Sequence, residues 1–431
     1  MQRRCRPRCT GPAATSLAAV EGHITIVGHR WARHSHEVKD FLGRNRIPFI
    51  WLDLDHGRKA AAALANCNLD EAALPALIFP DGSAMADPSI DELANKLEMH
   101  TRAEHDYYDL VVVGAGPAGL AAAVYGASEG LSTAVIESEA PGGQAGTSSR
   151  IENYLGFPEG VSGAELAERA LTQAERLGAE VIAPAELTEL ELNDHFKTMR
   201  LSNGASLTSR TLIVASGVTY RELGAPGLGR LAGAGVYYGA ATTEAITAKG
   251  EHVYTVGSAN SAGQGAMYFS KFANKVTMLV RGPGLEANMS QYLIDQITST
   301  PNIEVRTECR VTEATGKDHL ETITIEASTG TETVPASFLF IFIGAEPRHP
   351  WLPDSVACDD QGYILTGPDV LEADSHMSQW PLQRHPFHLE SSVPGIFAAG
   401  DVRHGSIRRV AGAVGEGSTA VQLVHRYLAQ A

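Results

Sequence analysis

Cysteine is scarce in this sequence, which has five cysteines among 431 residues. No two of them have the C-x-x-C spacing of a zinc site or of a local redox dithiol. Their odd number and irregular spacing also argue against a disulfide framework. The sequence therefore predicts no metal site and no redox chemistry between neighbouring cysteines.

Long apolar runs and positive charge are lacking as well. No stretch approaches the roughly 18–20 apolar residues that a membrane helix needs. The 34 basic residues are outnumbered by 50 acidic ones, and the net charge of −16 argues against nucleic acid as a partner. Residues 1–22 are Arg-rich at their start and no clear cleavage site follows, so we expect a disordered leader rather than a signal peptide. The expected location is therefore cytoplasmic.

What the sequence does contain is three regions of different pattern. Residues 23–100 alternate apolar runs with helical stretches, which is typical of a small α/β unit, and residues 101–106 form a polar linker. The second region covers residues 106–222 and resumes as 343–431, whereas residues 223–342 carry a separate glycine-rich strand–turn–helix pattern. This order predicts one nucleotide-binding domain with a second one inserted into it.

The first glycine-rich turn follows an apolar strand, Asp109–Val113, and precedes a helix expected over Leu120–Ala127. In a dinucleotide fold the first glycine permits the tight turn, the second lets the backbone approach the pyrophosphate, and the third lets helix and strand pack closely. The helix N-terminus offers unpaired N–H groups to the phosphates. Glu137 follows Gly114 by 23 residues, where a carboxylate accepts hydrogen bonds from a ribose diol. The predicted dinucleotide site consists of Gly114, Gly116, Pro117, Ala118, Gly119 and Glu137.

Further motifs in the same order make the sequence similar to the thioredoxin reductase family from Asp106 to Ala431. They are Gly142-Gly143-Gln144, Ile151-Glu152-Asn153-Tyr154, Ala215-Ser216-Gly217, Gly395–Asp401 with Arg408, and Gly415-Glu416-Gly417. The resemblance implies an α/β fold with two Rossmann-like three-layer domains, one for FAD and one for NAD(P), and a homodimer. It places Gln144 and Asn153 beside the flavin and Asp401 at the ribityl chain. It also makes Gly143, Gly400 and Arg408 FAD-binding residues.

The second glycine-rich turn follows the strand His252–Val256 and is Gly257-Ser258-Ala259-Asn260-Ser261-Ala262. Ala259 replaces a glycine of the family pattern and adds one methyl group beside the expected pyrophosphate path. The next strand ends in Arg281, which can pair with a 2′-phosphate, whereas an acidic residue would favour the ribose diol of NADH. We therefore predict NADPH in preference to NADH, with a domain that binds neither as the alternative. The predicted contacts are Gly257, Ser258, Asn260, Ser261 and Arg281.

The redox dithiol of the family has no counterpart in the matching segment. Thioredoxin reductases carry a C-x-x-C motif in the nicotinamide domain, and this chain has Val236–Thr243 there. Gly239 and Thr242 stand where the two cysteines would be. Neither can form a thiolate or a disulfide, so thioredoxin reduction is in doubt and the catalytic residues are unknown.

The N-terminal region also lacks a C-x-x-C motif at the position where its resemblance would place one. Residues 23–100 resemble thioredoxin- and glutaredoxin-like domains through the strand His23–Val27 and through Leu74-Pro75, where that fold places a cis-proline. Its C-x-x-C position is occupied by Ala32-Arg33-His34-Ser35. We interpret the region as a docking or dimer-contact module. The segment Gly367–Glu390 is an insertion relative to the family and is expected to form a surface loop, with a substrate-lid role as an alternative.

Electrons must leave the flavin directly when no protein dithiol takes them up. The leading hypothesis is an NADPH-dependent FAD oxidoreductase of thioredoxin reductase type that passes electrons to oxygen, a quinone, a ferredoxin or a small substrate. The second is a flavin-bound sensor or scaffold whose N-terminal domain recruits a partner. The third is an oxidoreductase acting on an external thiol or disulfide. The two nucleotide domains of the family rotate during turnover, and hinge strands near Glu222 and Ile343 would permit this motion here.

Overall fold

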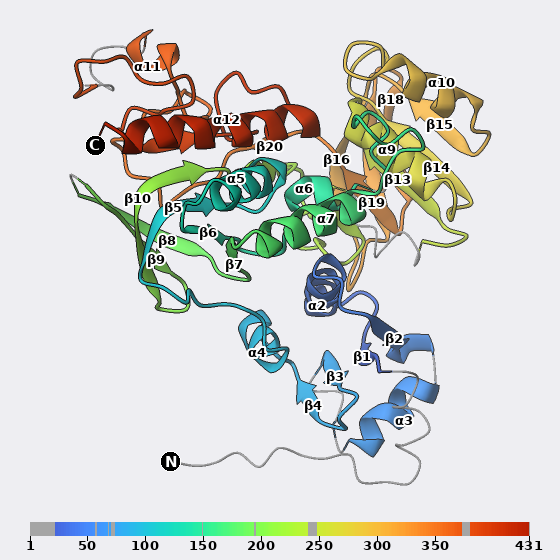
Figure 1. Cartoon of the computed structure of the whole chain (residues 1–431). Helices are drawn as coiled ribbons and strands as arrows, with labels where there is room; N and C mark the ends of the chain where they lie inside the picture. The colour runs from blue at the N-terminus through green and yellow to red at the C-terminus, as the bar shows by residue number, and fades with distance from the viewer. Residues whose placement is uncertain are drawn as a thin grey trace. The chain divides into compact units, whose positions relative to one another are not determined.

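The computed structural model describes residues 22–56, 58–67, 69, 74–148, 150–193, 195–239, 248–372 and 380–430. Contacts between residues divide the chain, drawn in Figure 1, into two compact units. Unit 1 comprises Met1–Leu93 and Glu222–Ile343, and unit 2 comprises Ala94–Arg221 and Gly344–Ala431. The predicted leader, apart from Gly22, lies outside the described residues.

The centre of unit 2 is a sheet with the strand order β7-β6-β5-β10-β9-β8, to which β21 adds beside β10. Its parallel strands are β5 (Tyr107–Val113), β6 (Thr133–Ile136), β7 (Glu180–Ile182), β10 (Ser206–Val214) and β21 (Ile396–Ala398). The antiparallel strands are β8 (Leu187–Leu192) and β9 (Lys197–Leu201). Within β5, Leu110 and Val112 belong to one hydrophobic core, and Val111 and Val113 to another. Burial on both faces explains the uninterrupted apolar run of this strand.

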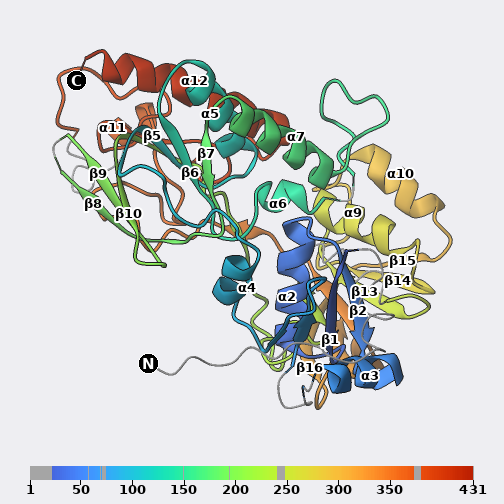
Figure 2. The same cartoon turned by 60° about the horizontal axis from the view of Figure 1, so that its bottom comes forward.

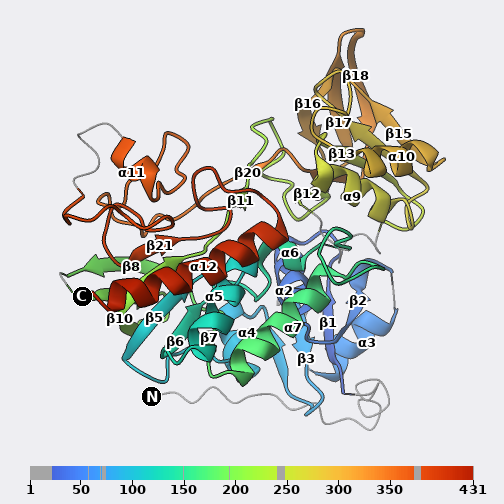
Figure 3. The ribbon, with the colours of Figure 1, turned by 45° about the horizontal axis from the view of Figure 1, so that its top comes forward.

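Helices cover one face of this sheet. α5 (Pro117–Ser128) packs against α7 (Gly163–Arg176) and α12 (Val410–Leu428), and Figure 3 shows α5 and α12 side by side. α5 begins three residues before the predicted Leu120, because Gly116 caps it and Pro117 fits the first helical position, where an N–H has no partner in the helix. The shorter elements of unit 2 are α6 (Gly143–Gly146), β11 (Thr219–Tyr220), β20 (Ala345–Glu346) and α11 (Pro368–Glu372).

Unit 1 contains a parallel sheet with the order β12-β19-β13-β14-β15. Its strands are β12 (Val236–Tyr238), β13 (His252–Val256), β14 (Lys275–Leu279), β15 (Ile303–Arg306) and β19 (Phe338–Ile341). One face packs against α9 (Asn260–Phe269) and α10 (Gln291–Ser299), which lie beside β13–β15 in Figure 3. The other packs against an antiparallel sheet of β16 (Cys309–Thr315), β17 (Thr322–Ala327) and β18 (Gly330–Pro335).

The N-terminal part of unit 1 is a separate sheet with the order β2-β1-β3-β4. Its strands are β1 (Ile24–Gly28), β2 (Phe49–Asp53), β3 (Ala76–Ile78) and β4 (Ala84–Ala86). β1 runs parallel to β2 and antiparallel to β3. The helices are α2 (Arg33–Arg44), which lies beside β1 in Figure 2, η1 (Leu54–His56), α3 (Arg58–Asn66) and α4 (Ile90–Lys96). The Leu74–Pro75 peptide is cis, as the sequence predicted.

Cys67 is disulfide-bonded, which the spacing of the cysteines did not indicate. One sequence expectation needs correction. The insertion Gly367–Glu390 is not only a surface loop, because Leu389 and Glu390 at its end are completely buried. Arg384 anchors this end with two hydrogen bonds to the Glu390 carboxylate, of 2.6 and 2.9 Å. Residues 373–379 of the insertion lie outside the described residues.

Among the described residues, none of the helices combines the length and the apolar character that crossing a bilayer requires. The same residues contain no cluster of three or more His, Cys, Asp or Glu side chains arranged to hold a metal ion.

Lys197 on β9 is a buried cation near the edge of the unit 2 sheet. Its Nζ donates a hydrogen bond to the Arg210 carbonyl oxygen at 2.9 Å and lies 5.3 Å from the centroid of the Tyr427 ring. Burial lowers the pKa of this ammonium to about 8; Arg210 lowers it further, whereas Glu390 raises it. The folded protein therefore favours the neutral amine more than the unfolded chain does.

This pKa predicts a pH dependence of stability. Between pH 8 and the usual lysine pKa of 10.5, the unfolded chain binds a proton that the folded protein does not, so the contribution of Lys197 to the free energy of unfolding rises with pH. We expect Lys197→Met to remove this rise in urea unfolding curves recorded from pH 7.5 to 10.5. The control is Lys275→Met at an exposed ion pair of β14. Identical slopes for Lys197→Met and the parent protein would contradict the prediction.

Candidate functional site

The glycines of the first turn have distinct steric reasons for lacking a side chain. A Cβ on Gly119 would lie 1.8 Å from the Gly114 carbonyl oxygen, so this glycine allows α5 to approach β5. Gly114 has φ +102°, and its Cβ would lie 2.4 Å from the carbonyl oxygen of Ala215. A Cβ on Gly116, in contrast, would meet no atom within 4 Å. The first and third glycines are required by the protein's own packing, and the second faces open space at the N-terminus of α5.

Glu137 follows β6 directly and supports the same turn. Its side chain is buried, and its Oε2 accepts a hydrogen bond of 2.8 Å from the backbone N–H of Ala115. Its Oε1 accepts one of 2.9 Å from the N–H of Glu139. The sequence predicted a ribose contact for Glu137 but not this hydrogen bond to Ala115. The carboxylate thus orients the turn that precedes the helix.

The segment around α6 lies against the turn. The Gly142 N–H donates to the Ala115 carbonyl oxygen at 2.7 Å, and a Cβ on Gly143 would lie 3.1 Å from the Gly116 Cα. Gln144 donates a short hydrogen bond from its Nε2 to the Val218 carbonyl oxygen. Asn153 is exposed, and no side-chain hydrogen bond ties it to any described residue. The fold therefore brings Gly143 to the glycine turn, whereas it leaves Asn153 free of contacts that would fix it there.

The loop after β21 and the body of α12 complete the surroundings of α5. A Cβ on Gly417 would lie 2.1 Å from the Ala118 carbonyl oxygen, and one on Gly400 would lie 3.0 Å from the Ala118 Cβ. The Glu416 carboxylate accepts a hydrogen bond of 2.7 Å from the Gly400 N–H and pairs with Arg403 at 2.7 Å. The sequence contained Glu416 in a motif but gave it no role. Its role is to fix the loop that carries Asp401.

Asp401 is the titratable group of this loop. Burial raises the pKa of its carboxyl group; Glu416 raises it further, and Arg408 opposes the shift. No hydrogen bond links the Asp401 side chain to a described residue. The carboxyl group thus has unused capacity for hydrogen bonds with the hydroxyl groups of a ligand.

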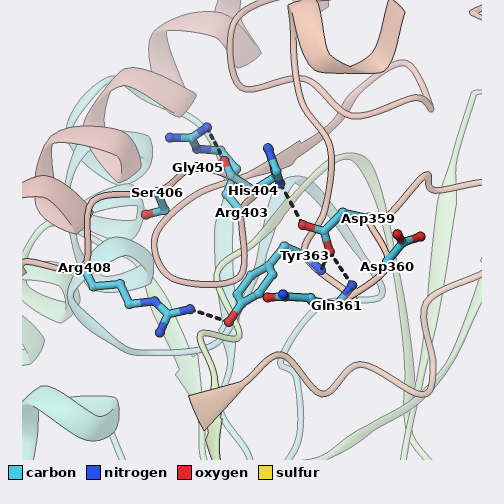
Figure 4. Close-up of a pocket in the computed structure, with 9 residues that line it drawn as sticks. All are labelled: Asp359, Asp360, Gln361, Tyr363, Arg403, His404, Gly405, Ser406 and Arg408. Carbon is cyan, nitrogen blue, oxygen red and sulfur yellow. Dashed lines mark hydrogen bonds and ion pairs between the residues drawn. The ribbon is translucent and has the colours of Figure 1, made fainter. Parts of the chain in front are cut away.

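A cavity of about 460 Å³ lies between this loop and the residues that lead into Tyr363. Figure 4 shows its lining, which is Asp359, Asp360, Gln361, Tyr363, Arg403, His404, Gly405, Ser406 and Arg408. Arg408 donates to the Tyr363 hydroxyl group, and His404 bonds to Asp359 at 2.7 Å. Although burial raises the pKa of Asp359, its hydrogen bonds to His404 and to backbone N–H groups hold it below the usual value.

Two polar atoms near this cavity have no partner among the described residues. They are Ser406 Oγ and Arg403 Nε, and both are buried. Ser216 Oγ, beside the Ala215 backbone that packs on Gly114, is buried and unpartnered as well. Buried polar atoms are normally hydrogen-bonded, so these three are available to a polar ligand. The open space at Gly116 and these atoms fit a dinucleotide such as FAD.

The second glycine turn has the same construction at its start. Gly257 has φ +141°, and its Cβ would lie 2.4 Å from the Phe342 carbonyl oxygen. Ala262 is completely buried, as expected of the residue that packs helix on strand. Asn260 accepts a 2.8 Å hydrogen bond from the Ser290 N–H, and Ser258 lies 3.5 Å from Asn288 Nδ2. These side chains therefore also tie α9 to the segment before α10.

Ala259 and Ser261 are exposed at the beginning of α9. Ala259 is the N-cap residue, and no side chain caps the helix there. Arg281 follows β14 and is exposed; no described residue forms an ion pair or a side-chain hydrogen bond with its guanidinium group. The edge thus presents free backbone N–H groups and a free cation to an anion.

Gly239 follows β12 at the same edge of the unit 1 sheet. Its N–H donates to the Ile341 carbonyl oxygen at 3.0 Å, and its φ is +77°. β19 lies between β12 and β13, with Ile341 opposite both Tyr238 and Val256. Gly239 and Gly257 therefore follow the two strands that flank β19. Thr242, the other predicted dithiol position, lies outside the described residues.

The family is shown by comparison with known proteins. The family model described as pyridine nucleotide-disulphide oxidoreductase matches residues 108–417. The chain belongs to this family of oxidoreductases. The matched range excludes the N-terminal sheet, which is an extension relative to the family model.

Within the family, thioredoxin reductases are among the proteins that this chain resembles. That of Bacillus subtilis is 33% identical over 331 residues, which cover 75% of this chain and 96% of the relative. That of Listeria monocytogenes is 32% identical over 328 residues, covering 75% and 95%. The crystal structure of the Lactococcus lactis enzyme covers 75% of this chain and 100% of its own, with 27% identity and a TM-score of 0.67. The T. acidophilum structure has 28% identity, the same coverage and a TM-score of 0.66. The predicted α/β fold of thioredoxin reductase type is confirmed.

Proposed function

We propose that the protein is an NADPH-dependent FAD oxidoreductase of thioredoxin reductase type whose electron acceptor is not a dithiol of its own chain. The observation that carries this proposal is the combination of Gly116 and Gly239. Gly116 leaves open space at the N-terminus of α5, and the glycines on either side of it in the motif, Gly114 and Gly119, are required by packing. Gly239 stands where the family has a redox cysteine. The cofactor site is retained, whereas the usual next electron carrier is not.

Unit 2 is the proposed FAD-binding part. The N–H groups at the start of α5 would bind the pyrophosphate, and Glu137 would hold the turn and accept from the ribose. Asp401 would accept from ribityl hydroxyl groups, since its carboxyl group has no bond to a described residue. Bound FAD would supply the chemistry of accepting a hydride and releasing electrons. The chain's own residues bind and orient it.

The two free thiols that the structure describes are poor candidates for an acceptor within this chain. Burial raises the pKa of the Cys309 thiol, and it raises that of Cys358 to about 11. Cys67 is disulfide-bonded. A thiolate is the reactive form of cysteine, so neither described thiol is prepared for redox exchange at neutral pH. Oxygen, a quinone, a ferredoxin or a small organic molecule is the proposed acceptor class.

Anaerobic mixing of the purified holoprotein with NADPH tests the proposal. We expect the flavin absorbance to bleach, and we expect it to return on addition of oxygen, a quinone or a ferredoxin, but not of oxidised thioredoxin. A flavin that neither NADPH nor NADH bleaches would overturn the proposal and favour a flavin-bound sensor or scaffold. Reoxidation by external disulfides alone would instead assign the protein to thiol–disulfide chemistry.

Arg281 gives a prediction on nucleotide choice. If its free guanidinium group binds the 2′-phosphate of NADPH, Arg281→Ala removes a charged hydrogen bond worth about 1.5–3 kcal/mol, or roughly 10- to 100-fold in Kd. NADH has no such phosphate, so its Kd should not change. Titration calorimetry with both nucleotides measures the difference. Arg310→Ala removes an arginine that pairs with Glu326 elsewhere in unit 1 and serves as the control. Equal weakening of both nucleotides would contradict the role.

The N-terminal sheet is proposed to be a thioredoxin-like docking module. Its strand order β2-β1-β3-β4, with one parallel and two antiparallel pairings, supports this assignment. Ala32 and Ser35 stand at its C-x-x-C position, so the module has no dithiol there. We also propose that the protein is a homodimer. Analytical ultracentrifugation at several protein concentrations measures its oligomeric state.

A further inference from the structure

The turn between β1 and α2 is in contact with the parallel sheet of the same unit. The Trp31 ring stacks on the His319 ring, with centroids 4.9 Å apart and planes 15° apart. It also lies 5.3 Å from the ring of Phe338, the first residue of β19. Trp31 packs at the margin of the hydrophobic core that covers this face of the sheet. The tryptophan is therefore partly buried by residues far from it in sequence.

Neighbouring residues extend this contact in both directions. The Arg30 guanidinium lies 4.8 Å from the Trp31 centroid and 5.5 Å from that of Phe338. On α2, the His36 ring is 5.1 Å from the Tyr237 ring of β12. The Cα of Arg33 would lie 3.4 Å from a Cβ on Gly233. The turn at the C-x-x-C position is thus a docking surface. It binds the face of the parallel sheet formed by β12 and β19 of the same chain.

The other end of the N-terminal part continues along the chain into unit 2. The boundary between the units falls between Leu93 and Ala94, inside α4. His34 Nε2 bonds to the Pro88 carbonyl oxygen at 3.0 Å and so ties the segment before α4 to α2. After α4, the His100 carbonyl oxygen accepts from the Ala183 N–H at 2.8 Å.

Glu180 on β7 strengthens this second attachment. Its Oε1 lies 2.8 Å from His100 Nε2 and 2.7 Å from the N–H of Glu104. Only residues 97–99 separate the end of α4 from His100, and the Met99 N–H is bonded back to the Ala94 carbonyl oxygen at 3.0 Å. Three extended residues span at most about 11 Å. The connection between the N-terminal part and unit 2 is therefore short.

The chain crosses between the units at two further points, and these lie together. One crossing is Arg221 to Glu222 and the other is Ile343 to Gly344. β11 pairs antiparallel with β20, and the Arg221 N–H donates to the Gly344 carbonyl oxygen at 3.0 Å. Two adjacent crossings form a hinge, which permits rotation of one body against another. A third attachment that does not lie on the rotation axis restricts that rotation.

We propose that the N-terminal part is an intramolecular clamp, in which Trp31 docks on His319 and Phe338 while the short segment before His100 ties it to unit 2. A relative motion of the two units that separates His100 from the docked N-terminal part by more than the slack of residues 97–99 then requires the Trp31 contact to open. This limit does not depend on the electron acceptor.

Hydrogen exchange of the full-length holoprotein, without nicotinamide nucleotide, tests the clamp. Trp31→Ala and His319→Ala remove the two halves of the aromatic stack from opposite sides. We expect each to raise exchange in residues 231–238 and at the hinge amides of β11 and β20 by at least about fivefold. His319→Ala does not change any residue of the N-terminal part. If both variants raise exchange, the rise therefore cannot be attributed to a folding defect of the N-terminal part in Trp31→Ala. Lys317→Ala, in the same loop as His319 but highly exposed, is the matched control.

A second variant separates docking from tethering. Ten glycine and serine residues inserted between Met99 and His100 add a root-mean-square span of about 17 Å. We expect exchange at the hinge to rise as in Trp31→Ala, while exchange in residues 231–238 stays at the wild-type level. Unchanged exchange in residues 231–238 for both stack variants would overturn the docking. Unchanged hinge exchange in the inserted variant would overturn the tether. Flavin bleaching by NADPH is scored separately, so failure of the proposed function is distinguishable from failure of the clamp.

Discussion

Gly116→Ala is expected to yield a folded protein that retains less FAD. Gly116 has φ −71° and ψ −175°, which alanine adopts readily, and its Cβ would meet no protein atom within 4 Å. The added methyl group would project into the space at the N-terminus of α5 where the pyrophosphate is expected to approach. An overlap of this kind costs roughly 1–3 kcal/mol, which is about 10- to 100-fold in affinity. The chain itself should not be strained.

Two measurements check this result. The ratio of flavin to protein absorbance after purification reports retention, and the thermal midpoint of the apoprotein reports the fold. Gly119→Ala is the contrasting variant, because its Cβ would lie 1.8 Å from the Gly114 carbonyl oxygen and would force α5 away from β5. It should lower the midpoint of the apoprotein, whereas Gly116→Ala should not. Gly229→Ala, also in open space but in unit 1, is the control. Wild-type FAD affinity in Gly116→Ala would place the pyrophosphate elsewhere.

Glu390→Ala is expected to destabilise unit 2 by about 3–5 kcal/mol, the range for removing one partner of a buried ion pair. The Glu390 side chain is completely buried and forms two hydrogen bonds with Arg384. Its oxygens also accept from the N–H groups of Phe387, at 2.9 Å, and Gly395, at 3.1 Å. The variant would leave the mostly buried Arg384 cation and two N–H groups without an acceptor. It would also remove the charge that raises the pKa of Lys197.

Urea unfolding at pH 7 measures this loss, with FAD saturating in every sample so that cofactor loss does not add to it. Glu390→Gln keeps an acceptor oxygen but not the charge, so its destabilisation should be intermediate. Glu165→Gln removes the partner of Arg169 at an exposed pair on α7 and should cost well under 1 kcal/mol. Equal unfolding midpoints for Glu390→Ala and Glu165→Gln would show that the buried pair does not stabilise unit 2.

The glycine turns and the strands around them were predictable because their requirements are local. The strand before Gly114 and the one before Gly257 occur where the sequence indicated them. Both glycines have positive φ, as the tight turn requires. Such conformations, and the apolar runs of buried parallel strands, depend on residues within a few positions of each other. Pattern and spacing are then sufficient.

Other parts of the site depend on partners that the sequence does not bring together. Glu416 lay within a predicted motif, but its hydrogen bond to the Gly400 N–H links a helix to the loop before it. The burial of Glu390 could not be deduced from an insertion that has the composition of a surface loop. The negative charge of Glu390 raises the pKa of Lys197, which lies on β9, far from Glu390 in the sequence. Charge and polarity alone favour exposure, and only the surrounding core reverses that expectation.

The sequence by itself determined an α/β protein with a glycine turn at Gly114–Gly119 and with glycine rather than cysteine at position 239, because these features follow from residue identity and local backbone geometry. Only the tertiary structure decided that Trp31, in the turn without cysteines, docks on His319 and Phe338. It also decided that Ser406 Oγ and Arg403 Nε are buried without a partner. Contacts and burial of this kind arise when segments distant in sequence pack together, and no local pattern specifies which residues will meet.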